Sequence, residues 1–282
     1  LNRFWMSSML PMFAICKSSI DFKMQSIYTV HTNDCFDGMK GGWIRMKPYQ
    51  GILAFIGYFL LLFMVFAFVS MDYYEVIAGI IALIAFGWLL HKKRMLHLSS
   101  RDLKGSQLLF CVGIGLGLAL ISKIAIVLGV LSQEPITEQN VPDPFFWAVS
   151  LATTVVLIPI VEELLFRGIL FGSFCRAFSY KIAIVLSAVL FMLVHSMVSW
   201  PSVFVIGVLL AWLYWQTDNL AVTMVIHGTV NFGSLLAIPL YTLLTTNRTL
   251  GIMAGLLMVL LGIGITYLCI KKFLQKHDAL PA

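Results

Sequence analysis

Residues 158–168 read IPIVEELLFRG, so two adjacent carboxylates and an arginine lie within an otherwise apolar run. A soluble helix carries such charges on its solvated face. In a membrane helix, a charged side chain near the bilayer centre costs about 2.5–3.5 kcal/mol on insertion scales, and intramembrane ionisable residues therefore mark candidate functional sites. The meaning of this stretch depends on whether the chain spans a membrane.

The composition is that of a membrane protein. Of the 282 residues, 60% are hydrophobic and only 11% are charged, and the mean hydropathy is +0.94. Soluble domains carry about 25% charged residues. We therefore predict an all-α fold, a polytopic membrane helical bundle. The net charge of +6 does not indicate a nucleic-acid partner, because the basic residues cluster in short loops beside apolar segments, as the positive-inside rule describes.

Apolar runs long enough to cross about 30 Å of hydrocarbon follow one another from residue 49 onward. We predict eight transmembrane helices. The fifth and sixth are separated at Ser199-Trp200-Pro201, where the proline and a short polar break indicate a tight turn. The predicted spans are residues 49–70, 74–90, 107–132, 146–173, 181–199, 201–216, 219–243 and 249–270.

The predicted organisation has four parts. Residues 1–48 form an N-terminal tail without a sustained apolar run, 49–132 hold the first three spans, 140–243 hold a core, and 244–282 hold the last span and a cytoplasmic tail. The first part is either a cytoplasmic extension or a segment that is not translated. The second reading rests on the initial Leu1 and on Lys40-Gly41-Gly42, which a ribosome-binding site before Met46 could encode.

Charges between the spans predict the orientation, with both termini in the cytoplasm, and a plasma-membrane location if the chain is bacterial. Only Arg248 falls on the opposite side. The basic residues predicted on the cytoplasmic side are Lys92, Lys93, Arg94, Arg101, Lys104, Arg176, Lys181, Lys271, Lys272 and Lys276, and the acidic residues predicted outside are Asp72, Glu75, Glu134, Glu138 and Asp143.

The third span contains two further features. Its run of glycines, Gly113-Ile114-Gly115-Leu116-Gly117, lacks the context of a nucleotide-binding fingerprint and predicts close helix packing. Lys123 lies in the same span. Its side chain is either buried against the polar site or extended to the membrane surface by snorkelling.

Two more predicted spans carry polar groups that could meet the glutamates. His195 follows an apolar run, and His227 and Asn231 share one helix face at i, i+4. At about 1.5 Å per residue, Glu162 lies about 16 Å from the cytoplasmic end of its span, His195 about 21 Å and His227 about 12 Å. The differences between these three depths are within the range that the tilt of membrane helices allows. One cavity is therefore possible.

The two adjacent glutamates are expected to have different partners. Glu163 and Arg167, at i, i+4, face the same way, so Arg167 is expected to neutralise Glu163. Glu162 points elsewhere and can meet His195 and His227 as a general base. The alternative is a purely structural polar cluster. Interhelical hydrogen bonds contribute well under about 1 kcal/mol in membranes, which compensates poorly for burying three charges.

Together these residues resemble the signature motifs of the CAAX-processing and bacteriocin-processing family, also called Abi or CPBP intramembrane proteases. The motifs are Glu162-Glu163-x-x-x-Arg167, Phe191-x-x-x-His195 and His227-x-x-x-Asn231, in that order on separate spans. The resemblance covers roughly residues 140–243, which it identifies as the protease core.

The resemblance implies that Glu162 and His195 activate a water molecule, and that His227 and Asn231 stabilise the oxyanion. Glu163, Arg167 and Phe191 would have positioning roles, although Arg167 could instead hold a substrate carboxylate. Glu162, His195 and His227 are also a possible zinc ligand set. The HExxH pattern of zinc proteases is absent from the sequence, and we favour catalysis by glutamate without a metal or other cofactor.

The leading hypothesis is therefore an intramembrane endopeptidase, similar to the CAAX prenyl proteases, whose partners are the lipid bilayer and a membrane-associated or apolar peptide or protein substrate. One alternative is a non-catalytic bacteriocin self-immunity or scaffold protein. A second is a proton-coupled transporter, because glutamate and histidine relays within membranes also carry protons. The absence of matching half-sequences argues against transport.

Overall fold

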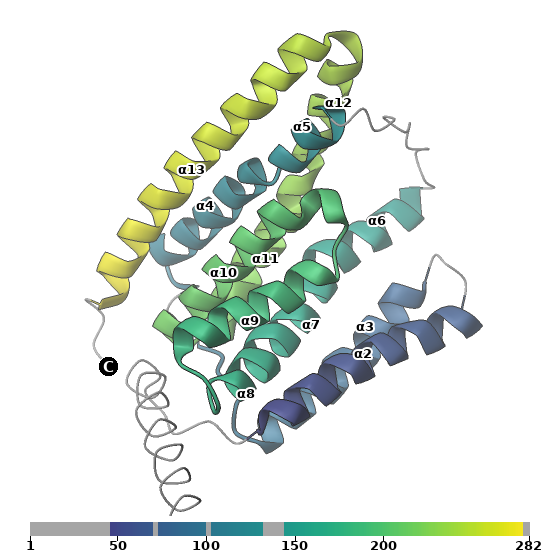
Figure 1. The fold of residues 1–282 in the computed structure, drawn as a ribbon, viewed down its shortest axis with the longest axis vertical. Helices are drawn as coiled ribbons and strands as arrows, with labels where there is room; N and C mark the ends of the chain where they lie inside the picture. Colours follow the sequence, from purple (N-terminus) through teal and green to yellow (C-terminus); the bar gives the residue numbers. More distant parts are fainter. Residues whose placement is uncertain (1–45, 70–72, 100–102, 132–143, 279–282) are drawn as a thin grey trace, which may run out of the picture.

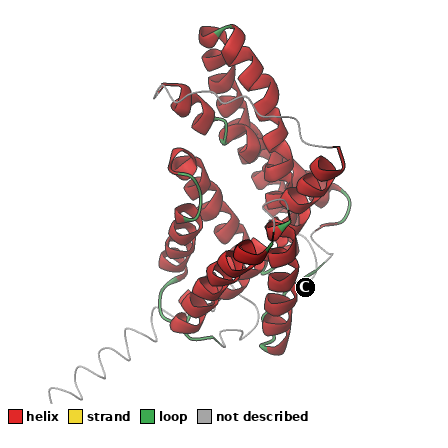
Figure 2. Ribbon diagram, turned by 90° about the vertical axis from the view of Figure 1, so that its right-hand side faces the viewer, coloured by secondary structure: helices red, strands yellow, loops and turns green. Residues whose placement is uncertain are grey.

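The computed structural model describes residues 46–69, 73–99, 103–131 and 144–278, and every regular element in these ranges is a helix (Figures 1 and 2). The all-α prediction is confirmed. Residues 1–45, most of the predicted N-terminal tail, lie outside the described residues.

Seven helical segments in the described ranges are long and apolar enough to cross a membrane, so the protein is a multi-pass integral membrane protein. Their elements are α2 (Pro48–Phe68), α3 (Tyr74–Lys92), α4 (Ser106–Ile121) with α5 (Ile124–Leu131), α6 (Pro144–Ala152) through α8 (Gly172–Phe174), η4 (Met197–Ser199) with α10 (Trp200–Thr217), α11 (Leu220–Phe232) through α12 (Ala237–Thr246), and α13 (Arg248–Asp278).

The eighth apolar helix, α9 (Tyr180–Leu193), is 14 residues long. At 1.5 Å per residue this is about 21 Å, less than the roughly 30 Å of hydrocarbon. The helix is shorter than the predicted span of 181–199, because the His195 N–H donates to the Met192 carbonyl in a tight turn. The 3-10 turn η4 follows, and Pro201 in the first turn of α10 restarts the chain as a helix. His195 therefore lies beyond the end of α9.

Close packing of α4 against α11 and α13 forms one half of the bundle (Figure 1). A Cβ built on Gly262 of α13 would lie 2.5 Å from the Gly117 carbonyl oxygen of α4, so only glycine fits at this crossing. The packing interpretation of the glycine run is thus confirmed. Small residues allow membrane helices to approach in this way.

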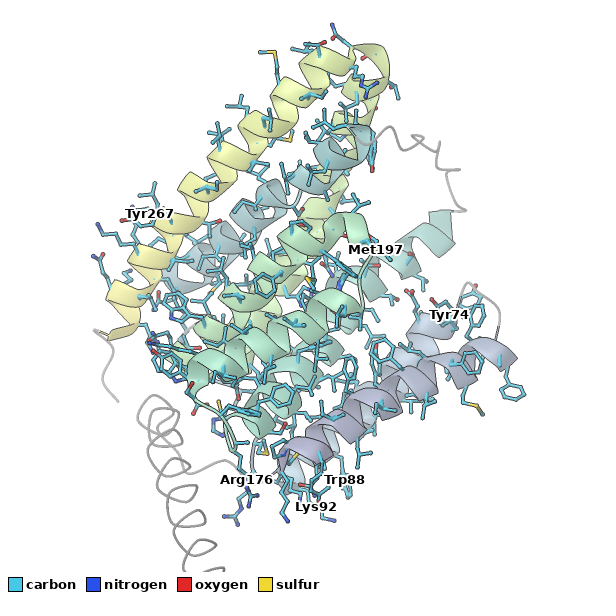
Figure 3. All side chains as sticks on the ribbon, viewed as in Figure 1. Tyr74, Trp88, Lys92, Arg176, Met197 and Tyr267 are labelled. Carbon is cyan, nitrogen blue, oxygen red and sulfur yellow. The ribbon has the colours of Figure 1, made fainter. Side chains whose placement is uncertain are left out.

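The outer helices present apolar side chains to their surroundings. Phe63 on α2 is 68% exposed and Leu260 on α13 is 67% exposed. Figure 3 shows Tyr267 projecting from the outer face of α13. In water such surfaces would associate, but lipid chains cover them in a membrane.

Basic side chains gather at one end of the molecule. Figure 3 shows Lys92 and Arg176 near each other there, whereas Tyr74 lies at the far end of the α2–α3 pair. Arg248, the exception to the charge pattern, has a structural partner. Its Nη2 donates to the Val130 carbonyl in the last turn of α5 at 2.7 Å, where a cation stabilises the unpaired carbonyls of a helix end.

Candidate active site

The helix that carries the two glutamates contains two π-helical segments, η2 (Thr153–Leu157) before α7 (Ile158–Glu163) and η3 (Leu164–Phe171) after it. In η2 the Ile158 N–H donates to the Thr153 carbonyl, five residues earlier. The next donor in this register would be residue 159, which is proline and has no N–H. The Thr154 carbonyl is therefore left for another donor. It accepts a hydrogen bond from Asn231 Nδ2 on α11 at 2.9 Å.

Gly228 allows α11 to approach this helix closely. A Cβ built at Gly228 would lie 2.7 Å from the Val155 carbonyl oxygen, a distance that no ordinary side chain tolerates. The contact sets the register between the two helices. It places His227 and Asn231, which flank Gly228 on α11, next to the segment that carries Glu162 and Glu163.

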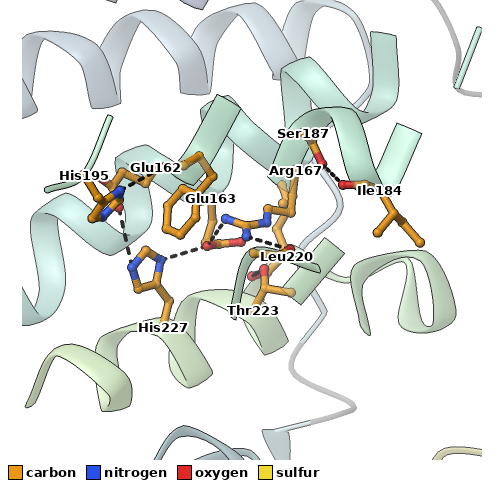
Figure 4. Close-up of polar contacts among 11 residues, drawn as sticks. Glu162, Glu163, Arg167, Ile184, Ser187, His195, Leu220, Thr223 and His227 are labelled. Atoms are coloured by element: carbon orange, nitrogen blue, oxygen red, sulfur yellow. Dashed lines mark hydrogen bonds and ion pairs between the residues drawn. The ribbon is translucent and has the colours of Figure 1, made fainter. Parts of the chain in front are cut away.

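Glu163, Arg167 and His227 form a buried group that we call the ion network (Figure 4). Glu163 Oε1 accepts hydrogen bonds from Arg167 Nη1 at 2.7 Å and from His227 Nδ1 at 2.8 Å. Because a carboxylate only accepts hydrogen bonds, the His227 proton is assigned to Nδ1. The Glu163 and Arg167 side chains are 0% and 1% exposed. The expected Glu163–Arg167 pair is present, and the His227 bond adds a partner from another helix.

Phe191 packs against this network. The Arg167 guanidinium lies 4.7 Å from the centroid of the Phe191 ring, in cation–π geometry, and Arg167 Nη2 also donates to the Gly207 carbonyl of α10 at 3.2 Å. The Phe191 ring centroid is 4.8 Å from that of His195 and 5.6 Å from that of His227. Phe191 therefore lies between the arginine and both histidines, a position that suits the predicted positioning role.

Glu162 lies on the other side of His227. Its Oε2 is 3.5 Å from His227 Nε2, and its side chain is 15% exposed, unlike the fully covered Glu163. Since Nδ1 of His227 is held by Glu163, the imidazole ring points its Nε2 at Glu162. The structure thus brings Glu162 and His227 together, and Glu162 also interacts electrostatically with His195.

His195 is fixed by the turn that ends α9. Its Nδ1 donates to the Phe191 carbonyl at 2.7 Å, and its own carbonyl accepts from Trp200 Nε1 at 2.9 Å. These bonds leave Nε2 available for chemistry. Within the described ranges, no hydrogen bond or ion pair links the His195 side chain to Glu162 or His227. The turn, rather than the other site residues, holds His195 in place.

Site residues from separate parts of the chain line one cavity of about 540 Å³. His195, His227 and Asn231 line it together with Phe191, and Lys123 completes its polar wall. Glu162 is connected to this cavity through its contact with His227. A second cavity of about 590 Å³ runs along α11 beside Val225 and Phe232; its wall is almost entirely apolar and contains none of the predicted site residues.

The alternative zinc ligand set was Glu162, His195 and His227. Across the described parts of the chain, no three His, Cys, Asp or Glu side chains are grouped so that they could hold a metal ion. His227 and Glu162 are in contact, whereas no hydrogen bond or ion pair among the described residues joins the His195 side chain to either of them.

Two features of the site are not predicted by the sequence: Glu163 binds His227 as well as Arg167, and the Thr154 carbonyl anchors Asn231. For Lys123 the sequence left two alternatives open, and the buried one is confirmed, because the side chain is 3% exposed and lines the cavity. The sequence contains a signal for the position of Asn231 and another for that of Lys123. Pro159 within a helix always frees a carbonyl, and the polar pair Ser122-Lys123 in a long apolar run marks a break in the helix.

Comparison with known proteins shows which proteins the segment that carries this site is similar to. Residues 144–233 match the sequence model of the family described as type II CAAX prenyl endopeptidase Rce1-like. UPF0177 protein YxdF from Lactococcus lactis subsp. lactis (strain IL1403) is 35% identical over 78 residues, which are 27% of this chain and 42% of that protein. No solved structure matches the chain. The segment that carries all three motifs is therefore similar to the Rce1-like CAAX prenyl endopeptidases, which is the resemblance that those motifs predict.

Proposed function

We propose that the protein is an intramembrane endopeptidase that hydrolyses a peptide bond in a membrane-associated or apolar substrate, as CAAX prenyl proteases do. One observation carries this proposal. His195, His227 and Asn231 line a single cavity between membrane-spanning helices, and Glu162 contacts His227 at its edge. The family match of residues 144–233 supports the reaction class.

In the proposed reaction, Glu162 removes a proton from a water molecule with the assistance of His195. The water oxygen attacks the peptide carbonyl carbon, and a tetrahedral oxyanion forms. Glu162 then returns the proton to the amide nitrogen as the C–N bond breaks, which releases a carboxylic acid and an amine; the acid afterwards loses its proton to the amine or to solvent. General acid–base catalysis of this kind contributes about 10²–10⁴-fold to a rate.

His227 and Asn231 are proposed to stabilise the oxyanion. Asn231 Nδ2 carries two hydrogens, and the bond to the Thr154 carbonyl uses one of them. His227 donates from Nε2 only as imidazolium, because its Nδ1 hydrogen is bonded to Glu163. Glu163 is thus proposed to orient His227, and Arg167 to balance the charge of Glu163.

We favour catalysis by glutamate without a metal. In support of this proposal, no three His, Cys, Asp or Glu side chains in the described parts of the chain are grouped as metal ligands. We expect hydrolysis to survive exhaustive chelation. Loss of activity that is restored by added zinc would instead establish a metalloprotease.

The test compares wild type with Glu162→Gln and His195→Ala, each purified in detergent and incubated with a library of apolar peptides. Wild type is expected to cleave a subset, and each variant to cleave about 10²–10⁴-fold more slowly. Glu75→Gln is the matched control, because Glu75 is an exposed glutamate at the start of α3. It should retain full activity.

Equal processing by wild type and both site variants would refute the catalytic roles. Saturable peptide binding without cleavage would favour the immunity or scaffold alternative. Flux across liposomes that depends on Glu162 would favour the transporter.

We also propose that both termini face the cytoplasm. The shared location of Lys92 and Arg176 at one end of the molecule supports this orientation (Figure 3). Protease accessibility of a C-terminal tag in inside-out and right-side-out vesicles would test it.

A further inference from the structure

Lys123 lies at the break between α4 and α5. Ser122 Oγ donates to the Ala119 carbonyl at 2.7 Å as α4 ends, and α5 begins again at Ile124. The Lys123 side chain is only 3% exposed, so it does not snorkel to the membrane surface, and it lines the 540 Å³ cavity opposite the site residues of other helices. The break in the helix therefore brings a cation to the candidate active site.

The described residues supply no counter-ion for this ammonium group. Neither a hydrogen bond nor an ion pair of the Lys123 side chain occurs among them, and the wall of the cavity contains no carboxylate. Its other polar members are neutral or basic, including His195, His227 and Asn231. A charge taken out of water needs compensation by an opposite charge. The cavity is thus built to receive an anionic group.

The other side chains of the cavity wall indicate what kind of group is attached to the anion. Ile206, Val230, Leu235 and Ile238 give the same cavity an apolar surface. A free inorganic anion would make no use of these side chains. An apolar peptide that carries one carboxylate would satisfy both the lysine and the apolar wall.

We propose that Lys123 is a specificity-determining residue that binds a carboxylate of the peptide substrate. This proposal rests on the proposed endopeptidase function. The carboxylate belongs either to the C-terminus of the substrate or to an acidic side chain near the scissile bond. Both sources offer the same chemistry, and the experiment separates them.

The experiment uses the full chain in detergent and a peptide that wild type cleaves. The peptide is made with a free C-terminus, with a C-terminal amide, and with each Asp or Glu replaced by Asn or Gln. The form without the critical carboxylate should show a KM about 10- to 100-fold higher, since a hydrogen bond between charged groups contributes about 1.5–3 kcal/mol. The kcat should change little.

In Lys123→Gln the KM for the carboxylate peptide should rise by the same factor, while the neutral peptide is unaffected. Lys123→Arg should restore most of the preference. Lys181→Gln is the matched control, because Lys181 is exposed at the start of α9, and it should behave as wild type. An unchanged preference in Lys123→Gln would overturn the proposal.

A second measurement separates this proposal from the proposed function. Binding of fluorescent apolar peptides, in acid and amide forms, is measured in Glu162→Gln and in Glu162→Gln/Lys123→Gln. A carboxylate preference in the first that disappears in the second supports the role of Lys123 even if wild type cleaves nothing. Equal binding of both forms, or no binding of either, refutes it even if cleavage is observed.

Discussion

Two polar regions of this membrane protein meet at His227, and they are built differently. In the ion network, Glu163, Arg167 and His227 are almost completely buried and are hydrogen-bonded to one another. The second region, which we call the cavity wall, consists of Lys123, His195 and Asn231, whose side chains border open space. The first region pairs its charges internally, whereas the second has polar side chains that face the cavity.

The adjacent glutamates show the difference most directly. Glu163 is 0% exposed and accepts two hydrogen bonds, whereas Glu162 is 15% exposed and has His227 3.5 Å away. His227 belongs to both regions, because one ring nitrogen contacts each glutamate. Burial and partners, rather than residue type, distinguish these two carboxylates.

The largest effect is expected from breaking the ion network. Arg167→Met leaves the Glu163 carboxylate buried without its cation, which destabilises a folded protein by about 3–5 kcal/mol. The midpoint of thermal unfolding in detergent, measured by fluorescence-detected size exclusion, should fall sharply. Arg176→Met, at an exposed arginine, is the control. The double variant Arg167→Met/Glu163→Gln should recover part of the loss; an unchanged midpoint in the single variant would contradict the network.

A change in the cavity wall should affect activity much more than stability. Asn231→Ala removes a proposed oxyanion donor, and loss of one such donor lowers kcat about 10²–10³-fold in a soluble protease. The unfolding midpoint should fall much less than in Arg167→Met, because Asn231 is only partly buried and its loss removes one hydrogen bond, to the Thr154 carbonyl, which contributes about 0.5–1.5 kcal/mol. Parallel losses of kcat and stability would show that Asn231 is part of the framework instead.

Gly228→Ala should affect both regions moderately, because the added methyl group pushes α11 away from the helix that carries Glu162 and Glu163. The added methyl would lie 2.7 Å from the Val155 carbonyl oxygen. Overpacking of this kind destabilises by about 1–3 kcal/mol. We expect a lower midpoint together with reduced cleavage, because α11 carries both His227 and Asn231. Retention of full activity would show that the register between α11 and η2 is not needed.

The smallest effect is expected at Gly264, which belongs to neither region. A Cβ built there meets nothing within 4 Å. Gly264→Ala should leave cleavage unchanged and shift stability by no more than about 1 kcal/mol, in the stabilising direction, because alanine favours the helix over glycine. A large loss of activity would indicate that the outer face of α13 takes part in function.

Most of the fold follows from the sequence, because hydrocarbon thickness and charge placement fix the spans strongly. The Glu163–Arg167 pair also follows, since its i, i+4 spacing lies within one helix. The Glu163–His227 bond does not, because it depends on how two helices rotate against each other. Lys123 is ambiguous for a similar reason. Whether it snorkels or turns inward is decided by the break after Ile121, which hydrophobicity alone does not reveal.

The short length of α9 has a consequence for the surrounding lipid. The helix begins near the basic end of the molecule, beside Arg176, and ends after 14 residues, with the polar turn from His195 to Ser199 following it. A lipid leaflet that meets this turn must deform, because polar backbone is not stable against acyl chains. We therefore expect the bilayer to be thinner beside His195, which would shorten the path of water to the cavity.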